Sequence, residues 1–187
     1  MKINELKVSD LLEETRKVNA KPGGGAIVIL TANLAVNLIL MMDRKNWGDL
    51  SKKAAENRKL VEEISHILTK CADEDVYYAN LLIEKYKNKE KILEKDLVDA
   101  TKPQIKLNTL ALKALEVLAF YLGHGKRTTL TDGEIANEML FSVVKSSVPT
   151  IKANLNGVNY RYSIDEVLRD AQKLYQHNRD IIERRKA

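Results

Sequence analysis

The aspartate at position 75 lies where a helix normally carries an apolar residue. In the segment CADEDVYYANLL, the residues Cys71, Tyr78 and Leu82 lie at helical spacing from Asp75 and so share its helix face. A carboxyl group on an apolar stripe is expected to be buried, and burial raises its pKa. Such a group can hold or release a proton near neutral pH, as a general acid or base must. The alternative is that Asp75 pairs with a lysine at the edge of a bundle or subunit.

The local context of two further aspartates gives weaker support for a role in the site. Asp73 precedes Asp75 by two residues, which separates them by about 200° around a helix, so Asp73 is less suited to share a pocket with Asp75. Asp132 lies in the first turn of a predicted helix, where the helix dipole favours a carboxylate. Capping alone would explain Asp132.

The segment KPGGGA places three consecutive glycines, Gly23–Gly25, before a long apolar stretch. Glycines permit backbone torsions that other residues avoid, and they allow a ligand or another chain segment to come close. The unpaired N–H groups at the start of the following helix also suit an anion. The segment lacks the Gly-Lys-Ser/Thr of a phosphate loop and the spacing of a dinucleotide fingerprint. A tight turn between helices, which one glycine would satisfy, is the alternative to a ligand site.

Composition excludes several kinds of site. The one cysteine, Cys71, cannot form an intramolecular disulfide, and His66, His124 and His177 lack the spacing of metal ligands. Neither a metal site nor a serine-histidine-aspartate mechanism is therefore expected. The formal charge of +5 is mild, aromatic residues make up 5%, and basic residues alternate with acidic ones, so nucleic-acid binding is not expected.

The stretch 22–42 carries no charge and is long enough to span a membrane. Against a span stand the glycines at its start and two asparagines on one face, Asn33 and Asn37, each costly in lipid without a partner. A central buried helix is the favoured interpretation. The N-terminal segment carries acidic residues and no apolar core, so we expect no signal peptide and a cytoplasmic location.

Nearly every other pattern in the chain is helical, since it has only three prolines and eight glycines. We therefore predict an all-α fold, an up-and-down bundle of long helices forming a single domain over residues 1–187. The expected helices begin near Ser9 or Asp10, at the glycine turn, near Leu50, near Pro103 as a kink or boundary, at Thr131 and at Ser163. Capping boxes are predicted at Asp10–Glu13, Thr131–Glu134 and Ser163–Glu166.

In order and spacing these segments resemble the cyclodeaminase domain of formiminotransferase-cyclodeaminase and its stand-alone bacterial relatives, the formimidoyltetrahydrofolate cyclodeaminases and methenyltetrahydrofolate cyclohydrolases. The similarity spans nearly the whole chain, and its most specific element is the junction from the glycines into the apolar helix. The matching positions are Pro22, Gly23, Gly24, Gly25, Asp73, Asp75, Thr131, Asp132, Asn154 and Leu155.

The resemblance implies an all-helical homodimer that binds a reduced folate in a cleft near the glycine turn, with no cofactor beyond that substrate. It implies closure of 5-formimino-tetrahydrofolate to the 5,10-methenyl form with loss of ammonia, or hydration of the methenyl bridge to 10-formyl-tetrahydrofolate. Lys21, Lys126 or Arg127 would meet the glutamate tail. The expected catalytic residues are Asp75 and Asp73, and the expected substrate-binding residues are Pro22, Gly23, Gly24, Gly25, Asp132, Lys126 and Asn154.

The departures from the family pattern fall at polar positions. Ala26 replaces the serine after the glycines, Lys126 replaces an asparagine, and Thr150 replaces another. Asp49 and Leu50 stand where a basic pair is common. These changes leave open a second reading, in which the chain is a non-catalytic member that binds folate or another protein.

Overall fold

The apolar stretch after the glycines forms the central helix of the protein, α2 (Gly24–Met41). The structure is a computed structural model that describes residues 2–17 and 22–187, so Lys21 lies outside the described residues. Among them, α2 is the one helix long and apolar enough to cross a bilayer. It packs instead against α3 (Ser51–Lys87) and α5 (Leu130–Asn154). Its buried residues are Ala26, Ile29, Ala32, Ala35, Val36 and Ile39.

The two asparagines of α2 have protein partners on α3. Asn33 Nδ2 donates to Thr69 Oγ1 over 3.0 Å, and Ser65 Oγ donates to Asn33 Oδ1 over 2.7 Å. Asn37 Nδ2 donates to the same Ser65 hydroxyl over 3.0 Å. This polar cluster fixes α2 against α3 within the bundle.

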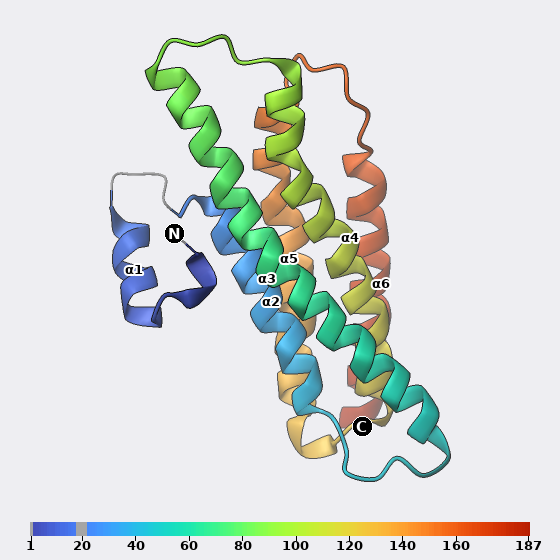
Figure 1. Cartoon of the computed structure of the whole chain (residues 1–187). Coiled ribbons are helices and arrows are strands. Elements are labelled where there is room, and N and C mark those ends of the chain that lie inside the picture. Colours follow the sequence, from blue (N-terminus) through green and yellow to red (C-terminus); the bar gives the residue numbers. More distant parts are fainter. Residues whose placement is uncertain (1, 18–21) are drawn as a thin grey trace.

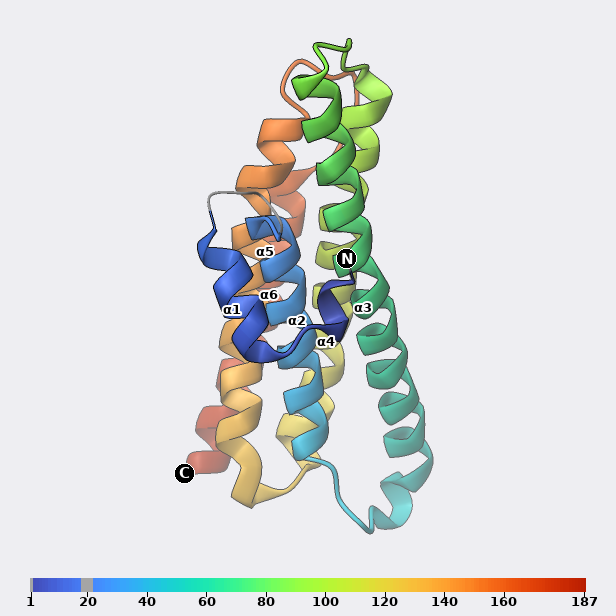
Figure 2. The same cartoon turned by 60° about the vertical axis from the view of Figure 1, so that its left-hand side comes forward.

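The remaining long helices complete an up-and-down arrangement, in which each helix runs opposite to the one before it (Figure 1). They are α4 (Glu94–His124), which contacts α3, α5 and α6, and α6 (Ile164–Lys186). The short helix α1 (Val8–Arg16) lies outside the bundle beside α2 (Figure 2). The predicted all-α bundle is confirmed.

Several predicted helix starts are wrong in detail. The helices α1 and α5 begin before Asp10 and Thr131, so both residues lie inside their helices and neither predicted capping box forms. A 3-10 turn, Arg127–Thr129, runs directly into α5 and displaces its start from the sequence signal. Ser163 is the N-cap of α6 as expected, but its side chain forms no capping hydrogen bond. Pro103 lies inside α4, so it is not the boundary of that helix.

Candidate functional site

The carboxyl group of Asp75 lies where three helices meet. Asp75 is on α3 and only 8% exposed. Gln104 on α4 donates from Nε2 to Asp75 Oδ1 over 2.7 Å, and the backbone N–H of Ala26 on α2 donates to the same carboxyl group. Burial raises the pKa of Asp75, and the hydrogen bonds from Gln104 and Ala26 oppose that rise. The burial predicted from helical spacing is confirmed.

Gly25 makes this arrangement possible because it has no side chain. A Cβ atom at Gly25 would lie 2.7 Å from Asp75 Oδ2 and 2.7 Å from Gln104 Nε2, well inside van der Waals contact. Unusual backbone torsions play no part, since Gly24 and Gly25 are helical and Gly23 has φ −77°. A Cβ at Gly24 would meet no atom within 4 Å. The close approach of two polar side chains therefore accounts for Gly25.

The acidic group at the start of α2 is a side chain of the protein itself. Asp75 accepts a hydrogen bond from Ala26, in the first turn of α2, where the helix dipole favours an anion. Within residues 2–17 and 22–187, no basic side chain forms a salt bridge with Asp75; Lys106 on α4 pairs instead with Glu74 at 3.5 Å. Within one chain, the described residues therefore provide no lysine partner for Asp75. Burial outweighs the hydrogen bonds from Gln104 and Ala26, because the pKa of Asp75 is raised overall.

A cavity of about 210 Å³ opens beside Asp75. Its floor is the glycine turn, and its far wall is the last turns of α5. Polar atoms come from Asp75, Thr150 and Asn154, while the rest of the lining is apolar or backbone. The lining residues are Gly23, Gly24, Gly25, Asp75, Ala79, Leu82, Ala100, Thr150 and Asn154.

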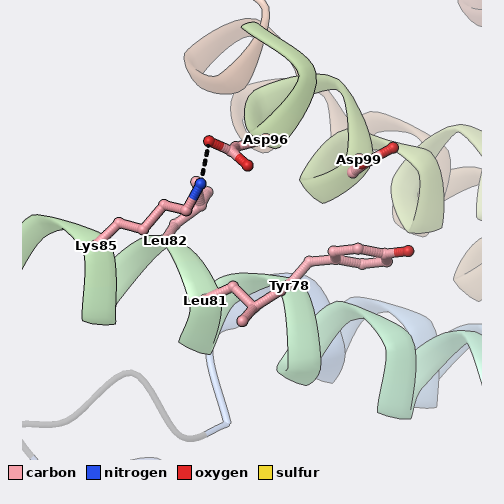
Figure 3. A pocket seen from close by; sticks show the side chains of 6 residues that line it. All are labelled: Tyr78, Leu81, Leu82, Lys85, Asp96 and Asp99. Carbon is pink, nitrogen blue, oxygen red and sulfur yellow. Dashed lines mark hydrogen bonds and ion pairs between the residues drawn. The ribbon is translucent and has the colours of Figure 1, made fainter. Parts of the chain in front are cut away.

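A smaller hollow of about 40 Å³ lies between α3 and α4, and Leu82 lines both this hollow and the cavity. In Figure 3, Tyr78 and Lys85 extend from α3, and Asp96 and Asp99 come from α4. Lys85 Nζ lies 2.7 Å from Asp96 Oδ2, which also accepts the Leu93 backbone N–H over 2.9 Å at the start of α4. The hydrogen bond from Lys85 is the main cause of the lowered pKa of Asp96. This ion pair holds α3 against α4, whereas Asp75 is the acidic side chain among the described residues that line the larger cavity.

Comparison with known proteins agrees with the motifs and the fold. The profile of the formiminotransferase-cyclodeaminase family matches residues 7–173. The chain belongs to this family. Its fold is similar to that of formiminotetrahydrofolate cyclodeaminase from Thermotoga maritima, with a TM-score of 0.86 over 97% of this chain and 98% of that one, at 18% identity. A comparison with curated proteins finds no match.

In this family member, the predicted site residues divide between two ends of the bundle. Gly23–Gly25, Asp75 and Asn154 line one cavity, and Pro22 is buried next to it. Asp132, by contrast, lies near the other end of α5 from Asn154, about 33 Å away at the helical rise per residue. Lys126 precedes the same distant end of α5. Within one chain, neither Asp132 nor Lys126 lines the cavity at Asp75.

Asp73 lies on another face of α3 from Asp75, as their spacing predicts. Its Oδ1 accepts the backbone N–H of Ile3 over 2.9 Å, and the nearby Asn4 Nδ2 donates to the Thr69 carbonyl over 2.7 Å. Ile3 is buried against the core. In this family member, Asp73 therefore ties the N-terminal segment to α3.

Gln104 is a site residue that the sequence motifs do not single out. A signal for it exists, because Gln104 lies at helical spacing from the buried residues Ala100, Leu107 and Ala111 of α4. This is the same pattern, a polar residue on an apolar stripe, that selected Asp75. Gln104 is 0% exposed, and its Oε1 atom has no hydrogen-bond partner among the described residues.

Proposed function

We propose that this chain is a folate-interconverting enzyme that uses Asp75 as a general acid and base. One observation carries the proposal: Asp75 is a buried carboxyl group with a raised pKa that lines a cavity. Membership of the formiminotransferase-cyclodeaminase family supports a reduced folate as the substrate. The reaction is cyclodeamination of the 5-formimino form or hydrolysis of the 5,10-methenyl form.

Both reactions pass through a tetrahedral carbon between two nitrogens and need a proton to move there. In cyclodeamination, N10 attacks the formimino carbon, the N10 proton and the proton of a protonated Asp75 pass to the formimino nitrogen, and that nitrogen leaves as ammonia while the methenyl cation forms. In hydrolysis, an ionised Asp75 takes a proton from the attacking water and returns it to N5 as the C–N5 bond breaks, while the hydroxyl proton of the intermediate is released to solvent as the formyl C=O bond forms. Burial raises the pKa of Asp75 above that of an exposed carboxyl group, which favours the protonated form that cyclodeamination uses, while the hydrogen bonds from Gln104 and Ala26 favour the ionised form that hydrolysis uses.

The cavity supplies surfaces for such a substrate. The backbone at Gly24 is open, and a flat ring could approach it because no side chain intervenes. Thr150 and Asn154 offer a hydroxyl and an amide on the opposite wall.

A second candidate function is a non-catalytic folate-binding member. Ala26 and Thr150 favour it, because the family pattern has a polar serine and an asparagine at these positions. Asp75 is also the one acidic or basic side chain among the described residues that line the cavity. This candidate predicts binding of reduced folate without turnover.

The deciding experiment follows the near-ultraviolet absorbance of 5,10-methenyl-tetrahydrofolate in two assays. Hydrolysis is measured as the loss of this absorbance, and cyclodeamination as its gain when the 5-formimino form is supplied. Wild-type protein, Asp75→Asn and buffer alone are compared, with Asp49→Asn as a matched control at an exposed position. We expect conversion faster than buffer with wild type and Asp49→Asn, and buffer rates with Asp75→Asn. Calorimetric titration of the protein with a reduced folate measures binding in parallel. Binding by wild type without conversion of either substrate would favour the non-catalytic candidate, and no binding would exclude both.

The proposal includes a cytoplasmic homodimer that buries the outer face of α2. Only 33% of α2 is buried, although its mean hydropathy is 2.0. Leu34 and Met41, two turns apart on α2, are 65% and 48% exposed. A second copy would cover this apolar face. Sedimentation velocity should show a dimer that Leu34→Glu dissociates, whereas Leu93→Glu, at the exposed leucine that precedes α4, should leave it intact. A monomeric wild type would contradict this part of the proposal.

A further inference from the structure

Four basic side chains surround one cavity at the end of the bundle farthest from Asp75. The cavity measures about 520 Å³. Arg44 comes from the connection after α2, Lys126 and Arg127 come from the turn between α4 and α5, and Arg185 comes from the last turn of α6. No acidic residue is among the described residues that line this cavity. We refer to Arg44, Lys126, Arg127 and Arg185 as the basic cluster.

Two members of the basic cluster are held in place by backbone carbonyls at the end of α4. Arg185 donates from Nη1 to the Leu122 carbonyl over 2.6 Å and from Nη2 to the Gly125 carbonyl over 3.0 Å. Arg44 donates from Nη1 to the His124 carbonyl over 3.2 Å. A helix C-terminus favours cations, which accounts for part of this arrangement. The carbonyls are neutral, however, so they do not cancel the positive charges.

Two other basic residues of α6 have carboxylate partners. Arg179 and Lys186 lie 3.0 and 2.8 Å from carboxylate oxygens of Glu134. In the described part of the chain, no member of the basic cluster has a carboxylate within salt-bridge distance. Burial, followed by the charges of Arg127 and Arg44, lowers the pKa of Arg185. The like charges are therefore close enough to repel one another.

We propose that the basic cluster binds a small multivalent anion through its phosphoryl or carboxyl groups. Guanidinium groups bind such anions through paired hydrogen bonds, and an anion would relieve the repulsion among the four cations. Space for it exists at Gly123, where an added Cβ would meet no atom within 4 Å. Within one chain, the basic cluster lies at the start of α5 and the cavity at Asp75 lies at its other end, and Asp132 and Asn154 near these two ends are about 33 Å apart.

Calorimetric titration tests the site with pyrophosphate and, separately, with citrate, on the full chain at constant ionic strength. Arg127→Gln is the test variant, because Arg127 is exposed and none of its side-chain atoms hydrogen-bonds to the described residues. Arg169→Gln, at an exposed position on α6, is the matched control. We expect saturable binding by wild type, weakened about tenfold by loss of one charge-assisted contact in Arg127→Gln and unchanged in Arg169→Gln. Asp75→Asn should bind as wild type does, which separates this site from the proposed reaction.

The two titrations also identify the anion. Tighter binding of pyrophosphate would assign phosphoryl groups, and tighter binding of citrate would assign carboxyl groups. The proposal is overturned if wild type binds neither anion, if Arg127→Gln binds as well as wild type, or if chloride at equal ionic strength competes equally. Salt-sensitive binding of duplex DNA by a protein that binds neither small anion would overturn it as well.

Discussion

Gln104 Nε2 donates to Asp75 Oδ1 over 2.7 Å, and the two side chains meet directly over Gly25. The amide orients the carboxyl group of Asp75 and stabilises its charged form, whereas burial favours the neutral form. The balance of these two effects leaves the pKa of Asp75 raised. Gly25 matters because a larger residue would push both partners away from the start of α2.

Replacing Gly25 with alanine should therefore destabilise the protein. A methyl group at this position would overlap both Asp75 and Gln104, and overpacking of this kind costs about 1–3 kcal/mol in the free energy of unfolding. Gly24→Ala is the matched control, because open space at that position should leave stability unchanged or raised by up to about 1 kcal/mol. Urea denaturation at one fixed protein concentration measures both. Equal effects of the two substitutions would contradict the close approach at Gly25.

The raised pKa of Asp75 predicts a pH dependence of stability. A carboxyl group whose pKa is raised on folding stabilises the native state at pH values below its unfolded pKa, and this contribution is lost as pH rises through the folded pKa. Asp75→Asn does not titrate, so its melting temperature relative to wild type should increase from about pH 4 to about pH 8. Thermal unfolding followed by circular dichroism gives this difference. A difference that shrinks with pH would mean that the pKa of Asp75 is lowered.

Removing the Gln104 amide should raise the pKa of Asp75 further. The hydrogen bond from Gln104 opposes the effect of burial, and methionine fills a similar volume without donating a hydrogen bond. In Gln104→Met, we expect a higher midpoint in a ¹³C NMR titration of the Asp75 carboxyl carbon, and the same upward shift in the pH dependence of any turnover. Gln172→Met, at an exposed position on α6, should leave the midpoint unchanged. An unchanged midpoint in Gln104→Met would show that the amide does not tune Asp75.

Cys71 should be unreactive in the folded protein. It is buried one turn before Asp75, and burial is the main cause that raises its pKa to about 12. Its Sγ donates to the Pro103 carbonyl over 3.2 Å. Since the thiolate is the reactive form, labelling by a disulfide reagent should be at least about a hundredfold slower than in urea. Ser142→Cys in a Cys71→Ala background provides an exposed control, and comparable rates for the two native proteins would contradict the burial of Cys71.

Much of the fold follows from the sequence because helical periodicity is a local property. The rarity of proline and glycine and the spacing of apolar residues predict long helices in an up-and-down bundle. The same spacing places Asp75 on a buried face and Asp73 on a different one. The glycine turn and the aspartate pair also predict the family correctly.

The exact helix starts depend on tertiary contacts instead. Thr129 Oγ1 donates to the Met41 carbonyl over 3.1 Å, which ties the start of α5 to the end of α2. Such a contact joins segments far apart in the chain, so the local capping pattern at Thr131–Glu134 could not reveal it.

The composition of the site was likewise decided by tertiary structure. Periodicity reports which face of one helix is buried, but not which residue of another helix meets that face, so the pairing of Asp75 with Gln104 required the packed bundle. The length of α5 separates Lys126 and Asp132 from Asn154, although the sequence places all three among the candidates for one site. Sequence by itself therefore determined the helices and the burial of Asp75, because both depend on local spacing. Only the packing of those helices decided which polar groups share a cavity, because that depends on their lengths and contacts.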